Sequence, residues 1–296
     1  MTNMFSRSWE ITKLSFDVMK KDKELLLFPL FSIIFSMLFI AALLFPTVIT
    51  FLIGGGTAGT MQGLYYVLIF ITYLGLAFIA TFFNVCVVYT AKKRFEGGNS
   101  RFGEALKFAF SKIHLIFMWS LLSATVGLIL RILDNMANKS KGIGRVLLKI
   151  LVSVLGMGWS IITIFVVPAM VYNNLSPFAA IKKSVQTLKK TWGESLIRHL
   201  GLGLIQGIFI LLGLVAIVLS VFLMIKVNVA IGALILIIAI IYIIVVALIF
   251  TVANSIFNTA LYEYAEKGKI PAGYNKEVMQ GAFKEQKKNF LGRGIV

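Results

Sequence analysis

The chain has 296 residues, of which 59% are hydrophobic and 14% are charged. Soluble domains carry about 25% charged residues, so this composition excludes an ordinary soluble globular domain. The single cysteine, Cys86, excludes an internal disulfide and a cysteine-based metal site, while the net charge of +17 has to be explained by where the basic residues lie.

A polar segment, residues 1–24, precedes the first long apolar run at residues 25–52. The polar segment contains four acidic residues, and the run that follows is too long for the core of a cleavable signal peptide. We therefore expect residues 25–52 to form a membrane-spanning helix.

Five further apolar runs follow along the chain. A helix needs about 20 residues to cross a hydrocarbon core of about 30 Å. The runs are continuous, whereas the strands of a membrane barrel would alternate apolar and polar residues. The sequence therefore predicts an all-α polytopic membrane protein with six transmembrane helices, the later five at residues 63–91, 114–133, 146–173, 195–225 and 229–262. In the fifth run, Gly203 and Gly207 are expected to let a neighbouring helix approach closely.

The basic residues are concentrated on one predicted side of the membrane. If the N-terminus is cytoplasmic, the inner segments hold 22 Lys and Arg and the outer loops hold 4. Lys and Arg accumulate on the cytoplasmic side of membrane proteins, so this bias predicts that both termini are cytoplasmic. The positive charge then indicates topology and attraction to anionic lipids, and it does not favour nucleic acid as a partner.

The segment Ser176–Trp192, SPFAAIKKSVQTLKKTW, predicts an amphipathic helix. Ser176 is placed to cap it, and Pro177 fits the first helical position. Two interpretations stay open, a helix lying in the cytoplasmic membrane interface and a helix packed on the cytoplasmic ends of the others. The apolar stripe consists of Phe178, Ile181, Val185, Leu188 and Trp192, and the residues expected to contact lipid headgroups are Lys182, Lys183, Lys189, Lys190 and Trp192.

Related patterns recur along the chain. Arg7–Phe16 aligns with the end of the 176–192 segment, Ser100–Phe110 aligns with its beginning, and Thr81–Lys93 aligns with Ser255–Lys267. These matches predict three repeated helix pairs, each preceded by a cytoplasmic interfacial amphipathic helix. We expect a single membrane domain, 1–296, with repeats at 4–91, 100–173 and 176–262. The cytoplasmic tail, 263–296, contains a candidate for a further amphipathic helix.

Polar residues within the apolar runs gather near the predicted inner ends. They could line a cavity open to the cytoplasm, in which Arg198 would attract an anionic headgroup. The alternative is that the amides bond between helices and Arg198 reaches the phosphate layer. The candidate substrate-binding residues are Asn84, Arg198, His199, Gln206, Asn254 and Asn258.

Catalytic patterns are absent from the sequence. His114 and His199 lie in different runs without a neighbouring pair of carboxylates, and no metalloprotease, nucleophile-elbow or phosphate-loop motif occurs. We expect no enzymatic activity, no cofactor and no metal.

The stretches MFSRSWEITKLSFDVMKKDKELLLFPL and SPFAAIKKSVQTLKKTWGE resemble an uncharacterised six-helix membrane family of bacteria and archaea. That family is similar to the membrane domain that accompanies some glycerophosphodiester phosphodiesterases. The matching helix motif falls on Ala180, Lys182, Ser184, Lys189 and Trp192. The resemblance implies the fold and a prokaryotic inner-membrane location, but the chain lacks the soluble phosphodiesterase domain, so no catalytic residue carries over.

These observations leave three functional hypotheses. The first is a non-enzymatic protein that binds or moves a lipid-like or anionic amphipathic substrate from the inner leaflet. The second is an accessory, scaffold or immunity-type protein that acts through a protein partner. The third is a channel formed by a homo-oligomer. Anionic membrane lipids are the expected partners in the first case.

Overall fold

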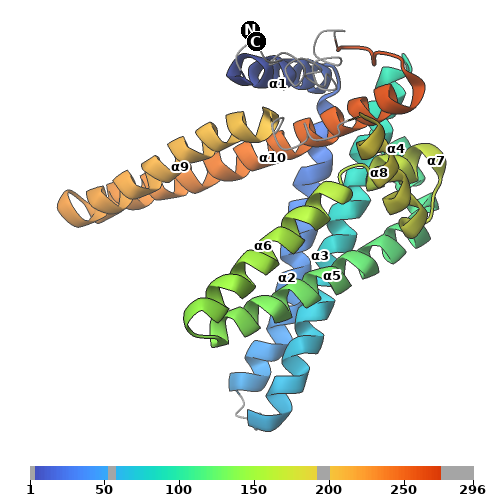
Figure 1. Cartoon of the computed structure of the whole chain (residues 1–296). Coiled ribbons are helices and arrows are strands. Elements are labelled where there is room, and N and C mark those ends of the chain that lie inside the picture. The colour runs from blue at the N-terminus through green and yellow to red at the C-terminus, as the bar shows by residue number, and fades with distance from the viewer. Residues whose placement is uncertain (1–3, 53–57, 192–200, 275–296) are drawn as a thin grey trace, which may run out of the picture. The chain divides into compact units, whose positions relative to one another are not determined.

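The computed structural model describes residues 4–52, 58–191 and 201–274 (Figure 1). Within these ranges every regular element is a helix and no strand occurs. The helices are α1 (Met4–Lys21), the 3-10 helix η1 (Lys23–Leu26), α2 (Leu27–Leu52), α3 (Ala58–Phe95), α4 (Phe102–Ser111), α5 (Ile113–Lys139), α6 (Gly142–Ile162), α7 (Val166–Asn173), α8 (Pro177–Thr191), α9 (Gly201–Lys226) and α10 (Val229–Lys267).

Six stretches of the described residues are long and apolar enough to cross a membrane. Large apolar side chains on these helices are exposed, for example Leu38 on α2 and Val218 on α9. Exposed apolar surface of this extent is stable where lipid chains cover it. The chain is therefore a multi-pass membrane protein, which confirms the predicted helical class. The six stretches are Lys23–Phe45, Tyr66–Phe95, Ile113–Lys139, Gly142–Asn173, Ile205–Lys226 and Val229–Lys267.

The chain divides into two compact units, and each is described separately. Unit 1 comprises Met1–Leu26, Arg94–Gly98 and Gln186–Val296. Unit 2 comprises Leu27–Lys93 and Asn99–Val185. Both units are discontinuous in sequence, whereas the three predicted repeats are continuous segments. The repeat boundaries therefore stay a prediction.

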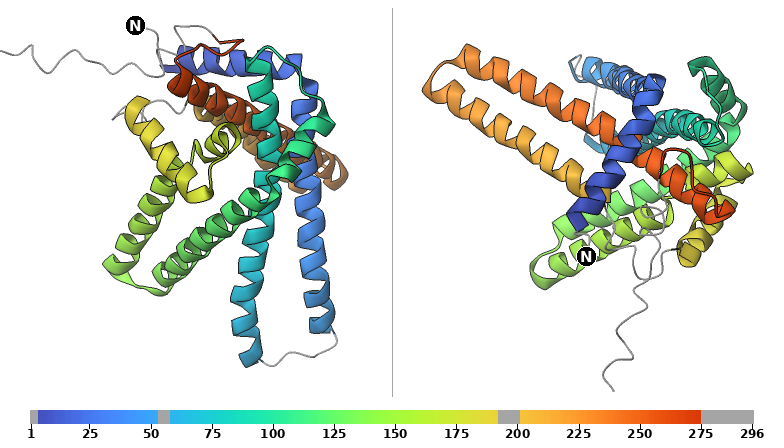
Figure 2. Two further views of the ribbon diagram at one scale, coloured as in Figure 1. Left: turned by 90° about the vertical axis from the view of Figure 1, so that its right-hand side faces the viewer. Right: turned by 90° about the horizontal axis from the view of Figure 1, so that it is seen from above.

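Helices α9 and α10 form the hairpin on which unit 1 is built (Figure 2). In the turn, the Asn228 side chain accepts hydrogen bonds from the backbone N–H groups of Ala230, at 2.8 Å, and Ile231, at 3.3 Å. These donors have no carbonyl partner within the helix, so Asn228 caps α10. At the other end, Gly268 adopts a left-handed conformation with φ +66° and donates its N–H to the Tyr264 carbonyl.

Close packing inside this hairpin depends on a glycine that the sequence did not single out. A Cβ atom on Gly213 of α9 would overlap the Ile243 side chain of α10, so the missing side chain lets the helices approach. Around the exposed Gly203 and Gly207 of the described structure, no atom other than the neighbouring residues and backbone of α9 itself lies within 4 Å of the position that a Cβ would take. Within the described part of unit 1 the pair therefore makes no close helix contact, and its role in packing against another helix stays a prediction.

Helix α1 packs against α9 and α10 within unit 1 (Figure 2). Its buried face includes Ile11, Ser15 and Val18, whose spacings of four and three residues form one stripe on a helix. The Ser15 hydroxyl lies 2.8 Å from that of Tyr274, and burial raises the pKa of the tyrosine. This contact ties the middle of α1 to the segment that follows α10.

A buried cluster of charges fixes the end of α1. Arg94 donates a hydrogen bond of 2.8 Å to the Lys21 carbonyl, and the same nitrogen lies 3.7 Å from an Asp22 carboxylate oxygen. Burial raises the pKa of Asp22, the Arg94 charge opposes that increase, and the charge of Glu24 adds to it. A cation beside the last carbonyls of a helix also interacts favourably with the helix dipole.

Aromatic side chains hold the helices of unit 2 together. Phe28 at the start of α2 stacks on Phe102 of α4, with ring centroids 4.9 Å apart, while Phe35 and Phe83 join α2 to α3 at 5.9 Å. Cys86 is fully buried, and its thiol lies 3.6 Å from a carbonyl oxygen of α4. This burial agrees with the role of a small packing residue.

The predicted run 146–173 is interrupted between α6 and α7. Pro168 has no N–H to donate to the carbonyl of Ile164, so an unbroken helix would lose a hydrogen bond and clash there. The backbone instead turns after Ile162 and resumes at Val166. The backbone N–H of Phe165 donates to the Ser184 hydroxyl of α8 at 3.2 Å. This buried N–H at the break therefore has a hydrogen-bond partner.

The three segments expected to form amphipathic helices are all helical, as α1, α4 and α8. Helix α8 begins at Pro177, as the sequence predicted. Its most buried residues include Ala180, Ser184 and Thr187, whereas Phe178, from the apolar stripe, is 69% exposed. Leu188 of the stripe is also buried, so the packed face of α8 combines this leucine with small side chains, while Phe178 points away from that face.

Candidate functional site

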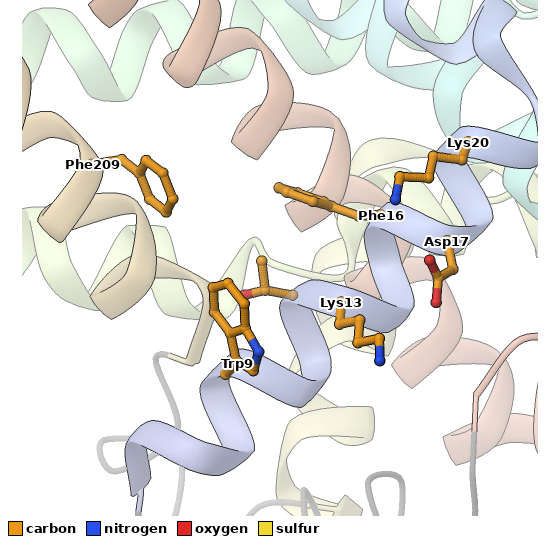
Figure 3. A pocket seen from close by; sticks show the side chains of 7 residues that line it. Trp9, Lys13, Phe16, Asp17, Lys20 and Phe209 are labelled. Carbon is orange, nitrogen blue, oxygen red and sulfur yellow. The ribbon is translucent and has the colours of Figure 1, made fainter.

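A pocket of about 330 Å³ opens between α1 and α9 in unit 1 (Figure 3). It combines aromatic rings with charged side chains, which suits a ligand that has both apolar and charged parts. Its lining consists of Trp9, Thr12, Lys13, Phe16, Asp17, Lys20 and Phe209.

The helical repeat of α1 brings most of the lining to one face. Trp9, Lys13, Phe16 and Lys20 follow one another at spacings of four, three and four residues, so they share one side of the helix. Thr12 is 3% exposed and lies at the base of this face. The local sequence therefore fixes the α1 side of the pocket.

The aromatic wall is assembled from three helices. Phe250 of α10 is 3% exposed and contacts Phe16 of α1, at 5.6 Å between ring centroids, and Phe209 of α9, at 5.9 Å. Figure 3 shows Phe16 and Phe209 pointing towards each other across the pocket, with Trp9 beside them. The buried Phe250 ring thus positions both phenylalanines.

The charged rim of the pocket is available to a ligand. Lys13 and Lys20 are exposed and Asp17 is half-buried. In the part of the chain that the structure describes, none of the three forms an ion pair. Their charges are therefore satisfied by solvent, or by a bound molecule of complementary charge.

Two lysines near the ends of unit 2 helices behave differently, because they bond within the protein. Lys93 donates a hydrogen bond to Glu104 at 2.7 Å, which lowers the pKa of that carboxyl group. Lys112 donates to the Asn174 side chain, also at 2.7 Å. The contrast marks the pocket lysines as the better candidates for binding an external anion.

The residues predicted to line a cavity are distributed over both units. Asn84 lies on α3 in unit 2, while Gln206 of α9 and Asn254 and Asn258 of α10 lie in unit 1; all four are half-buried. Their convergence on one cavity stays a prediction. Arg198 and His199 lie outside the described residues.

Two of the predicted residues share a helix with an aromatic residue at the α1–α9 pocket. Gln206 is three residues from Phe209 on α9, and Asn254 is four residues from Phe250 on α10, so each falls one helical turn from an aromatic residue of the pocket wall. The Trp and Lys spacing in residues 9–20 was a signal that could have indicated the α1 side. Nothing local to Phe209 indicates that it meets α1.

The lysines predicted to contact lipid headgroups lie on α8. Lys182 and Lys189 are exposed and Lys183 is half-buried. The Lys190 side chain and Trp192 lie outside the described residues. Among the described residues, no group of three or more His, Cys, Asp and Glu is placed to hold a metal ion.

Comparison with known proteins places the chain in a family. Residues 63–272 match a family described as a family of unknown function, DUF6159, and no curated protein matches the chain. The matched region includes Phe209 and Phe250 but not α1. Since the match spans more than half of the chain, this multi-pass membrane protein belongs to the DUF6159 family.

Proposed function

We propose that this protein is a non-enzymatic integral membrane protein that binds or moves a lipid-like or anionic amphipathic substrate from the inner leaflet. The α1–α9 pocket carries the proposal. In the described structure two lysines without an ion pair stand there beside Trp9, Phe16 and Phe209. A molecule with a phosphate group and an apolar body matches both parts of that lining.

The size of the pocket supports a headgroup and not a complete lipid. A volume of about 330 Å³ lies at the lower end of the range of small-ligand sites, about 300–1,000 Å³. Most of each acyl chain would remain outside, against the exposed apolar surface of the spanning helices. A tryptophan at the rim, such as Trp9, suits the headgroup region because its ring is apolar and its N–H is polar.

The proposed setting is the inner membrane of a prokaryote, with both termini in the cytoplasm. The distribution of Lys and Arg supports this orientation. The order of elements also supports three repeats, because α1, α4 and α8 each precede two apolar stretches. In this arrangement the three helices lie at the cytoplasmic surface, and the exposed Lys182 and Lys189 of α8 face the headgroups. We also propose that the chain is related to the membrane domains that accompany some glycerophosphodiester phosphodiesterases, a relationship that would bring no catalytic activity to it.

Native mass spectrometry of the protein extracted with its membrane lipids tests the proposal. We expect anionic phospholipid to remain bound to the wild type. The double variant Lys13→Ala, Lys20→Ala should retain about 30-fold less, since each cation near the surface contributes about 1 kcal/mol. The control is Lys139→Ala with Lys141→Ala, which removes two exposed lysines from the predicted outer side.

The outcomes separate the three hypotheses. Equal lipid retention by the double variant and the control would rule out the pocket as a lipid site. A defined protein that co-purifies in place of lipid would favour the accessory or scaffold hypothesis. A larger oligomer that conducts ions in planar bilayers would favour the channel.

A further inference from the structure

The pocket contains one group that an anion site does not need. Asp17 of α1 lines it together with Lys13 and Lys20. A carboxylate repels a phosphate, and the repulsion grows where water is excluded. A site that only attracted negative charge would therefore be weakened by Asp17.

The three charges alternate along one helix. Lys13, Asp17 and Lys20 are separated by four and three residues, which places them about 6 Å and 4.5 Å apart along the axis of α1. A Lys13–Asp17 ion pair on a solvated face would be the simplest use of this spacing. The described structure contains no such pair, so the pocket presents a positive, a negative and a positive group to a ligand.

We propose that the pocket selects a glycerophospholipid with a serine headgroup, an inference that rests on the function proposed above. This headgroup carries a phosphate, an ammonium and a carboxylate, so its charge pattern is negative, positive, negative. The two lysines bind the phosphate and the carboxylate, and the ammonium donates hydrogen bonds to Asp17. Every charge in the pocket then has a partner of opposite sign.

The apolar side of the pocket is consistent with this orientation. Trp9 precedes Lys13 by one helical turn and is 52% exposed, as expected for a residue at the rim of the pocket. In Figure 3 the rings of Trp9, Phe16 and Phe209 lie on one side of the pocket and Lys13, Asp17 and Lys20 on the other. The glycerol and the first carbons of the acyl chains lie against these rings, while the headgroup reaches the lysines and Asp17.

Other headgroups match the three charges less well. A glycerol headgroup brings a phosphate but no ammonium, and leaves Asp17 as a repulsive neighbour. An ethanolamine headgroup satisfies Asp17 but leaves one lysine without a partner. A choline headgroup has no N–H to donate, so it forms only a charge contact with Asp17.

The test is competitive binding of serine, glycerol, ethanolamine and choline phospholipids to the full chain in nanodiscs, read by native mass spectrometry. We expect the wild type to prefer the serine lipid. The Asp17→Asn variant should reduce the ratio of serine to glycerol lipid by about five- to tenfold, the loss of one charged hydrogen bond. A ratio within one sample does not depend on how much protein folds.

A matched control removes a charge of the same sign from the same helix. Glu10→Gln lies on α1 outside the pocket lining and should leave the ratio unchanged. The inference is overturned if the wild type shows no preference for serine over glycerol lipid, or if Asp17→Asn and Glu10→Gln change the ratio equally. Retention of glycerol lipid that still depends on Lys13 and Lys20 would in that case leave the proposed function standing.

A soluble competitor distinguishes a membrane lipid from a free phosphate compound. Glycerophosphoserine, which lacks acyl chains, should displace the serine lipid only at concentrations at least about 100-fold higher, because each buried CH₂ adds about 0.8 kcal/mol. Displacement at equal concentration would overturn the assignment to a lipid.

Discussion

The side chain of Asp22 is 5% exposed. Its carboxylate lies 3.7 Å from the Arg94 guanidinium and is close enough to Glu24 to be affected by its charge. In the described structure one oxygen of each carboxylate and the Nε of Arg94 have no hydrogen-bond partner. Burial raises the pKa of Asp22 above its value in the unfolded chain. The stability that this group contributes is therefore fully present below the unfolded-state pKa and is lost as the pH rises through the folded-state value.

Arg94→Met tests this cluster. At neutral pH the substitution leaves an ionised, buried Asp22 without its cation and removes the bond to Lys21, so we expect a loss of about 1–3 kcal/mol of stability. At acidic pH, where Asp22 is protonated, the loss should shrink. Thermal unfolding followed by tryptophan fluorescence between pH 4 and pH 8 measures both values. An equal loss at the two ends of this range would contradict the assignment.

At the scale of elements, the α9–α10 hairpin is held by the contact of Gly213 with Ile243. We expect Gly213→Leu to destabilise the protein by about 1–3 kcal/mol, because the new side chain cannot enter the interface without moving the helices. Gly207→Leu is the matched control on the same helix, since its position is open in the described structure. Unfolding temperatures of the two variants in one detergent give the comparison. A larger loss for Gly207→Leu would contradict the assignment of the close contact to Gly213.

At the scale of the whole molecule, topology can be tested with single cysteines. The background is Cys86→Ala, because Cys86 is the one native cysteine and is buried. We expect Lys139→Cys to react with a membrane-impermeant maleimide in intact cells and Lys189→Cys to react only after permeabilisation. Both native side chains are exposed, so access to the reagent depends on the side of the membrane. Labelling of Lys189→Cys in intact cells would overturn the cytoplasmic placement of α8. It would also overturn the proposal that the pocket takes its lipid from the inner leaflet.

The sequence by itself determined the class of protein and the positions of its helices. The six apolar runs and the helical segments that became α1, α4 and α8 follow from run length and residue periodicity, which are local properties of the chain. The start of α8 at Pro177 was likewise predictable, because proline restricts the local backbone. The sequence did not indicate the break before Pro168, because the freed N–H of Phe165 bonds to Ser184 of another helix.

Only the tertiary structure decided which faces of these helices meet. Periodicity identifies a stripe but not its partner. The sequence therefore did not indicate that Gly213 makes the close contact of the α9–α10 hairpin, or that Ala180 and Ser184 are buried while Phe178 is exposed. The pocket depends in the same way on Phe209 and Phe250 meeting α1, about two hundred residues away in sequence. Such contacts arise from packing between distant segments, and no local pattern specifies them.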